Sequence, residues 1–186
     1  LVMEGEGTEL DKTMLEQLTD PLVHIVRNSI DHGIENPDVR IAAGKPEMGT
    51  VKMAAFHQGG NILIQITDDG AGIDHHRIAA KAIEKGVIDE DHNLNRDEIV
   101  DLIFHAGFST ADEVSDISGR GVGMDVVRRN IRGLGGSVDV KTVPGEGSVF
   151  TIRLPLTLAI LDGQLCKVGA QTYVFPLVSI IESIQV

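Results

Sequence analysis

The chain has 186 residues, of which 42% are hydrophobic and 24% are charged, as in an ordinary globular protein. Its formal net charge of −12 argues against nucleic acid and anionic lipid as general partners. The single cysteine, Cys166, excludes an internal disulfide framework, and no apolar run approaches the roughly 18–20 residues that a membrane span needs.

The N-terminal part is predicted to form a short strand followed by two helices. The chain starts within an apolar strand-like pair, so we expect it to be a piece of a longer protein. Asp11 is well placed to cap the first helix. Pro21 should break or kink that helix and begin the second one, because the residue before a proline avoids the helical region. Gly33 and Pro37 mark the end of the second helix, and residues 38–50 are predicted to be a loop.

The second helix carries an unusual row of polar side chains. His24, Asn28 and His32 recur at four-residue spacing and should share one face, with Arg27 and Asp31 beside them. The opposite face is predicted to be apolar and buried, and consists of Leu22, Val23, Ile25, Val26 and Ile30. Such a helix is either one wall of a ligand site or an ordinary solvated face, and the helix alone does not decide between them.

A hairpin and a polar turn follow. Residues 51–56 and 61–67 have the pattern of two strands joined by a turn that contains two glycines. The second strand ends in the segment Asp68–Gly72, where a carboxylate is followed by glycines that allow close approach to the backbone. Asp68 could accept a hydrogen bond from an exocyclic amine in an apolar pocket.

Two helices and a long loop come next. Asp74 should cap a helix that stops at Gly86, and Asn95 with Glu98 has the spacing of a capping box. Residues 107–123 show little periodicity and contain much glycine and serine. A loop of this length in a compact domain is usually a lid or a binding loop.

The C-terminal part is predicted to contain one more helix and then only strands. The helix covers residues 124–134, and residues 137–143 and 148–154 form a second hairpin. After Pro155 the pattern changes to that of a small all-β module. Its three short strand-like runs are residues 156–161, 165–168 and 172–177.

Three polar segments together indicate a nucleotide site. The glycine-rich segment Gly119–Gly123 leads straight into a helix, so its free N–H groups could cradle an anion. The pattern fits neither the dinucleotide fingerprint nor the Walker A motif. Each segment alone also occurs in ordinary turns. Combined, they predict adenine on Asp68, a metal and phosphates at Asn28, and a glycine-rich lid over the phosphates.

These segments, in this order, resemble the boxes of the ATP-binding fold that histidine kinases, DNA gyrase-type ATPases, Hsp90 and MutL share, called the GHKL or Bergerat family. The N, G1, F and G2 boxes would be His24–Glu35, Asp68–Gly72, Phe104–Phe108 and Gly119–Gly123. The segments HIVRNSIDHGIE, DDGAGI, GFST and SGRGVGMDVV resemble chemotaxis histidine kinases more closely still. The resemblance implies an α+β fold, a two-layer α/β sandwich with a mixed sheet. It also implies a kinase catalytic domain in residues 1–155 and the truncated start of a CheW-like regulatory β-barrel module in residues 156–186.

The resemblance implies transfer of a phosphoryl group from ATP with Mg²⁺. His24, Arg27 and Asn28 would be catalytic, with Asn28 and His24 at the metal. ATP-hydrolysing relatives have a glutamate in the place of His24, so its absence favours transfer over hydrolysis. The implied nucleotide contacts are Asp31, His32, Asp68, Gly70, Gly72, Ile73, Arg77, Lys81, Phe104, Phe108, Ser109, Ser118, Gly119, Arg120, Gly121, Val122, Gly123, Met124 and Ser148. For Arg27, Asp31, Arg77 and Lys81, solvated or neighbour-paired side chains are the alternative.

Partners follow from the same resemblance. The substrate would be a histidine on a separate phosphotransfer domain. A coupling protein and chemoreceptors would bind the full-length regulatory domain, and response regulators would act downstream. The location would be cytoplasmic, at membrane receptor arrays for the full-length protein, with the chain alone monomeric and the full-length protein dimeric. The alternatives are an ATPase clamp of the gyrase or MutL type and a nucleotide-binding assembly platform without activity of its own.

Overall fold

A computed structural model describes residues 1–5, 7–108, 123–156, 163–169 and 171–176. The chain divides into two compact units, Leu1–Leu156 and Thr157–Val186. All the segments that the sequence singles out as a candidate site belong to the first unit.

The first unit is built on a five-stranded sheet with the order β1-β2-β3-β5-β4. β1 pairs in parallel with β2, and the remaining neighbours are antiparallel, so the sheet is mixed as predicted. Both predicted hairpins are confirmed. The strands are β1 (Val2–Glu4), β2 (Val51–Gln58), β3 (Asn61–Asp68), β4 (Ser137–Val143) and β5 (Gly147–Pro155).

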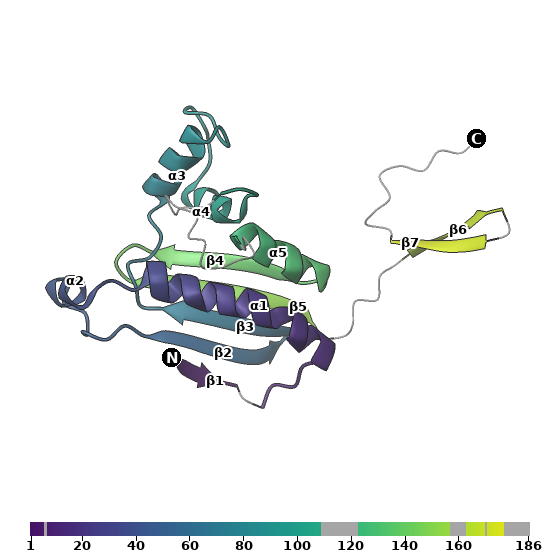
Figure 1. The fold of residues 1–186 in the computed structure, drawn as a ribbon, viewed down its shortest axis with the longest axis horizontal. Coiled ribbons are helices and arrows are strands. Elements are labelled where there is room, and N and C mark those ends of the chain that lie inside the picture. Colours follow the sequence, from purple (N-terminus) through teal and green to yellow (C-terminus); the bar gives the residue numbers. More distant parts are fainter. Residues whose placement is uncertain (6, 109–122, 157–162, 170, 177–186) are drawn as a thin grey trace. The chain divides into compact units, whose positions relative to one another are not determined.

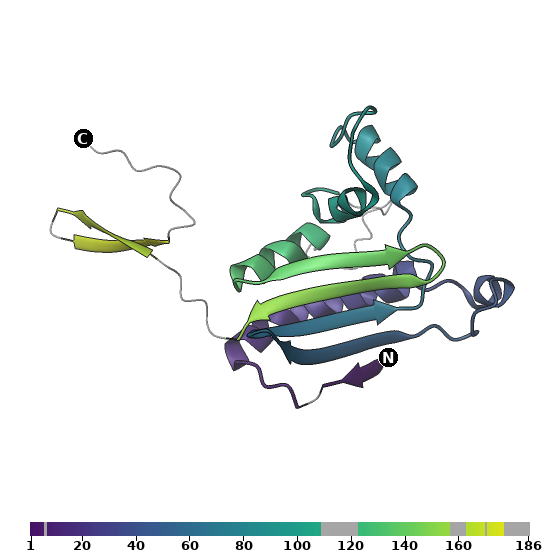
Figure 2. The same cartoon turned by 180° about the vertical axis from the view of Figure 1, so that it is seen from behind.

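Helices α1 (Lys12–Asn28) and α5 (Met124–Gly133) lie over one face of this sheet (Figure 1). Figure 2 shows the strands from the opposite side, with these helices behind them. Alternate residues of β3 and β5 point toward the helices because side chains in a strand alternate between its two faces. The fully buried members of the core among the described residues are Leu18, Ile25, Ile66, Ala82, Val127, Ile131, Ile152 and Leu154. The two-layer α/β sandwich is therefore confirmed.

The two predicted N-terminal helices are one. Asp11 caps α1 as expected, accepting hydrogen bonds from the backbone N–H groups of Thr13 and Met14 at 2.8 and 3.2 Å. Pro21, however, lies inside the helix and does not break it. A proline in a helix interior costs about 3 kcal/mol or more. Because Pro21 is fully buried on the same face as Leu18 and Ile25, the packing of that face offsets this cost.

The predicted second helix changes type after Asn28. The five residues Ser29–Gly33 form a π-helical turn, η1, in which the Ile34 N–H donates to the Ser29 carbonyl at 2.8 Å. The α-helix therefore ends at Asn28, and His32 lies in the π-turn with an exposed side chain. The opposite face is also less buried than predicted, since Val23 and Ile30 are 51% and 53% exposed.

The sequence predicted a loop at residues 38–50. The structure instead has helix α2 at Pro37–Ala42, so this prediction was wrong for the first part of the segment. Pro37 stands in its first turn, where its missing N–H costs nothing. Helix α3 (His75–Glu84) begins at the Asp74 cap, and α4 (Arg96–Asp101) begins with the Asn95–Glu98 capping box, both as predicted. A 3₁₀ turn, η2 (Leu102–Phe104), follows α4.

The second unit contains an antiparallel pair, β6 (Gly163–Val168) and β7 (Gln171–Pro176). Leu165 and Val174 on these strands are 71% and 67% exposed. Almost all of the predicted strand at residues 156–161 lies outside the described residues. In the part of the chain that the structure describes, no helix has the length and apolar character needed to cross a membrane.

Candidate nucleotide site

Asp68 stands at the end of β3 with only 4% of its surface exposed. Its Oδ1 accepts hydrogen bonds from the N–H groups of Gly70 and Ser148 at 3.1 and 3.2 Å, and its Oδ2 accepts one from the Ser29 hydroxyl at 3.1 Å. Burial raises the pKa of this carboxyl above its ordinary value, although the three donors act in the opposite direction. A carboxylate has about four acceptor positions, so Oδ2 retains one for a further donor.

Two glycines are required around this carboxylate by close backbone contacts. A Cβ on Gly70 would lie 2.1 Å from the Gly33 carbonyl oxygen, and one on Gly147 would lie 2.0 Å from the Asp68 carbonyl oxygen. Gly147 also has a φ of +122°, a conformation that other residues rarely adopt. The turn after β3 therefore packs against η1 and β5 only because positions 70 and 147 carry no side chain.

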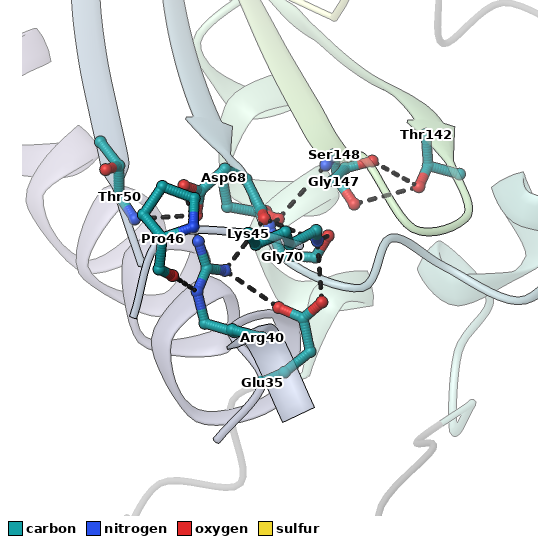
Figure 3. Close-up of polar contacts among 11 residues, drawn as sticks. Glu35, Arg40, Lys45, Pro46, Thr50, Asp68, Gly70, Thr142, Gly147 and Ser148 are labelled. Atoms are coloured by element: carbon teal, nitrogen blue, oxygen red, sulfur yellow. Dashed lines mark hydrogen bonds and ion pairs between the residues drawn. The ribbon is translucent and has the colours of Figure 1, made fainter. Parts of the chain in front are cut away.

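The backbone of the segment Asp68–Ile73 forms hydrogen bonds to η1 and to the β4–β5 hairpin. The Ala71 N–H donates to the Gly33 carbonyl at 2.8 Å, and the Ala71 carbonyl accepts from the Gly145 N–H at 2.7 Å. The Ile73 N–H donates to the Thr142 hydroxyl at 2.8 Å, and this hydroxyl lies 3.1 Å from the Ser148 hydroxyl (Figure 3). The turn is thus fixed between η1 and the β4–β5 hairpin, and the Ser148 N–H contacts Asp68 at its base.

Sequence reasoning missed a buried charge cluster on the same turn. The Arg40 side chain is fully buried and forms ion pairs with Glu35 at 3.0 Å and Asp69 at 2.9 Å. Lys45 pairs with Glu35 at 2.7 Å, and Figure 3 shows these contacts converging on the turn. Burial would raise the pKa of Glu35, but the hydrogen bond and charge of Lys45, a backbone hydrogen bond and the hydrogen bond from Arg40 bring the pKa below its usual value. An arginine within a predicted loop gave no signal of burial.

The start of α5 meets the end of α1 at Asn28. The Asn28 Nδ2 donates to the Met124 Sδ at 3.2 Å, which joins the predicted N box to the residue after the glycine-rich segment. One turn earlier, burial lowers the pKa of His24; the charges of Arg27 and His32 add to this, and Asp125 opposes it. His24 is therefore a neutral imidazole at pH 7 that retains a lone pair for a ligand.

The F-box aromatic residues are part of the core. Phe104 and Phe108 are 4% and 6% exposed. The Arg128 guanidinium lies 4.0 Å from the Phe104 ring centroid and forms an ion pair with Asp101. Both phenylalanines therefore pack within the hydrophobic core of the first unit.

The remaining predicted contacts divide into three groups. Arg27, Asp31, His32 and Arg77 are exposed, while Gly72, Ile73, Lys81 and Gly123 are half-buried. The third group lies outside the described residues and consists of Ser109, Ser118, Gly119, Arg120, Gly121 and Val122.

A recess elsewhere on the first unit is not part of this site. An open recess is lined by Asn95, Asp97, Glu98, Asp101, Asp139 and Val140. Its carboxylates would repel a polyphosphate, and none of its residues belongs to the predicted boxes.

Residues 17–158 match the family model described as histidine kinase-, DNA gyrase B- and HSP90-like ATPase. The chain belongs to this ATPase family. The family resemblance expected from the sequence is therefore confirmed. Across the whole chain, the "Chemotaxis protein CheA" of Rhizobium meliloti is 54% identical over 185 residues, and that of Bacillus subtilis is 52% identical over 181 residues and 96% of the chain. The chain spans about a quarter of the length of these relatives, 24% and 27% respectively.

Among solved structures, the blue-light activated histidine kinase EL346 of Erythrobacter litoralis superposes with a TM-score of 0.50 and 16% identity. The match covers 83% of this chain and 34% of that one. At this level of identity the likeness concerns the fold alone. It agrees with the mixed sheet covered by helices on one face that the ATPase family predicts here.

Proposed function

We propose that the chain is the ATP-binding catalytic domain of a chemotaxis histidine kinase, and that it transfers the γ-phosphoryl group of ATP to a histidine on a separate phosphotransfer domain. The observation that carries this proposal is the buried Asp68 carboxylate, fixed between Ser148 and Ser29, the residue after Asn28. Membership of the ATPase family and the two relatives named chemotaxis protein support it.

The proposed role of Asp68 is to select adenine. Its remaining acceptor position on Oδ2 would accept a hydrogen bond from the adenine 6-amino group, next to the Ser29 hydroxyl. Gly70 and Gly72 would let the base approach the backbone, and Ile73 would contact the ring. A guanine or hypoxanthine base presents a carbonyl at this position, which cannot donate to a carboxylate.

Asn28 would hold Mg²⁺. The contact of its Nδ2 with Met124 orients the carboxamide, so that its oxygen is the group offered to a cation. Among the described residues no group of three or more His, Cys, Asp and Glu could hold a metal ion. A single carboxamide oxygen, with neutral His24 nearby, fits a hard cation that takes its other ligands from phosphates and water. Bound Mg²⁺ would neutralise phosphate charge.

The other proposed contacts lie around these two anchors. Arg27, Asp31, His32, Arg77 and Lys81 would approach the phosphates. The glycine-rich segment Gly119–Gly123 would cover them, with Ser109 and Ser118 near its ends. Catalysis would consist mainly of positioning and charge neutralisation. Because His24 stands in the place of the glutamate that activates water in ATP-hydrolysing relatives, transfer would be favoured over hydrolysis.

Several features of the longer protein belong to this proposal. The second unit would begin a CheW-like regulatory module that binds a coupling protein and chemoreceptors in the cytoplasm. The chain alone would be monomeric, because dimerisation and the acceptor histidine would reside on other segments. A tight dimer in size-exclusion chromatography would contradict this part.

The test is a transfer experiment. The chain is incubated with γ-labelled ATP, Mg²⁺ and a separate phosphotransfer domain, and the acceptor is examined for acid-labile, base-stable phosphate. Labelled acceptor supports the kinase. Release of inorganic phosphate without the acceptor supports an ATPase, and ATP binding with neither product supports an assembly platform.

A further inference from the structure

The turn after β3 is anchored by the ammonium group of Lys45. Its Nζ donates to the Glu35 Oε1 at 2.7 Å, the Asp69 carbonyl at 2.9 Å and the Gly70 carbonyl at 2.7 Å. All three donor positions of the ammonium are therefore used. Only 16% of the Lys45 side chain is exposed, so these charge-assisted bonds are partly shielded from water.

Arg40 supports the same turn from the interior. Its Nη1 donates to the Asp69 carbonyl at 3.1 Å and to Glu35 at 3.0 Å, and its Nη2 donates to the Asp69 carboxylate at 2.9 Å. Its Nε donates to the Pro46 carbonyl at 2.8 Å, which holds the segment carrying Lys45 (Figure 3). The two cations and Glu35 form one connected cluster.

The cluster is linked directly to the Asp68 carboxylate. Lys45 holds the carbonyl of Gly70, and the N–H of the same residue donates to the Asp68 Oδ1. A rotation of the Gly70 backbone would break both bonds. The position of Oδ1 therefore depends on Lys45, although the lysine does not touch the carboxylate.

We propose that Lys45 is a positioning residue that sets the preference of the site for adenine over other purines. The inference rests on the proposed function, since it requires Asp68 to bind the base. Lys45 holds the turn so that the carboxylate presents its remaining acceptor position to a 6-amino group. Without Lys45 the turn relaxes, and the hydrogen bond from the 6-amino group to Asp68 contributes less to the affinity for ATP.

The experiment measures the affinity of the chain for MgATP and for MgITP, whose base lacks the 6-amino group, by titration calorimetry. Lys45→Met should weaken ATP binding about tenfold and leave ITP binding nearly unchanged. Lys45→Arg, which retains charge and donors, should restore most of the preference. The matched control is Lys52→Met, since Lys52 also pairs with a glutamate, Glu4 at 2.8 Å, but on the β1–β2 edge. Equal losses for ATP and ITP in Lys45→Met, or no loss, would overturn the proposal.

A double variant separates this proposal from the proposed function. In the Asp68→Asn background, Lys45→Met should cause little additional loss of ATP affinity, because both substitutions affect the same bond. Additive losses would overturn the positioning role. If Asp68→Asn weakens ATP binding while Lys45→Met leaves it unchanged, the inference alone fails. If wild type shows no preference for ATP over ITP, both the adenine site and the inference fail.

Discussion

Ser29 donates a hydrogen bond from its hydroxyl to the Asp68 carboxylate at 3.1 Å across 39 positions of sequence. This contact exists because the helical ladder widens into a π-turn immediately after Asn28. The turn buries Ser29 to 3% exposure and brings it under the end of β3. The proposed metal anchor and the proposed adenine anchor are thus joined through adjacent residues, Asn28 and Ser29.

Asp68→Asn should weaken ATP binding by about 1–3 kcal/mol, or roughly 5- to 150-fold, measured by titration calorimetry. The carboxamide retains one acceptor oxygen, so its NH₂ group must face either the base amine or the N–H groups of Gly70 and Ser148. Asp139→Asn on β4, more than half exposed and paired only with Arg153 among the described residues, is the control. Unchanged ATP affinity in Asp68→Asn would remove the residue from its role.

Asn28→Asp should abolish transfer to the acceptor domain. The substitution conserves shape but replaces the Nδ2 donor to Met124 by a charged oxygen, which disturbs the geometry offered to Mg²⁺. The measurement is the rate of acceptor labelling with ATP in excess. Asn130→Asp, on the exposed side of α5, should retain the wild-type rate. Wild-type labelling by Asn28→Asp would show that the carboxamide is not the metal anchor.

Arg40→Met should lower the free energy of unfolding by about 3–5 kcal/mol, because it leaves Glu35 and Asp69 without their buried partner. Urea denaturation followed by circular dichroism measures the change. Arg153→Met breaks an exposed pair with Asp139 and should cost no more than about 1 kcal/mol. Similar losses in the two variants would mean that the Arg40 cluster does not stabilise the fold.

Acid should weaken the fold partly through Glu35. The pKa of Glu35 is lower in the folded chain, so the unfolded chain binds more protons as pH falls through the carboxyl range. The stability that Glu35 contributes is complete above its unfolded pKa and is lost as pH falls through its folded pKa. Glu35→Gln should therefore show a flatter decline of the urea midpoint between neutral and acidic pH. A decline as steep as that of wild type would contradict the ion-pair assignment.

Gly70→Ala should remove ATP binding and destabilise the chain, because the added Cβ would lie 2.1 Å from the Gly33 carbonyl. Gly133→Ala is the control, since its Cβ would meet no atom within 4 Å and alanine favours a helix by about 0.5–1 kcal/mol. The measurements are the ATP affinity and the thermal unfolding midpoint of both variants. ATP binding by a folded Gly70→Ala protein would show that the turn tolerates a side chain.

Much of the fold could be predicted because its signals are local. The alternation in β3 and β5, the capping box at Asn95 and the glycine turns each depend on neighbours in sequence. The prediction that the helix breaks at Pro21 was wrong because burial, a tertiary effect, outweighed the local preference of proline for ending a helix. The π-turn after Asn28 has no periodic signature, so the sequence predicted a straight helix through His32.

The site was partly predictable for the same reason. The DxGxG pattern identified Asp68, and the order of the boxes gave the family. Ser29 and Arg40 were missed because a serine in a helix and an arginine in a polar stretch usually face water. Their roles arise from partners 39 and 29 positions away, which no local pattern reveals.

The most direct test of the account is a crystal structure of the chain with Mg²⁺ and a non-hydrolysable ATP analogue. We expect the adenine 6-amino group within hydrogen-bond distance of the Asp68 Oδ2, and the Asn28 Oδ1 as a ligand of Mg²⁺. An adenine bound away from Asp68, or a metal held without Asn28, would contradict it.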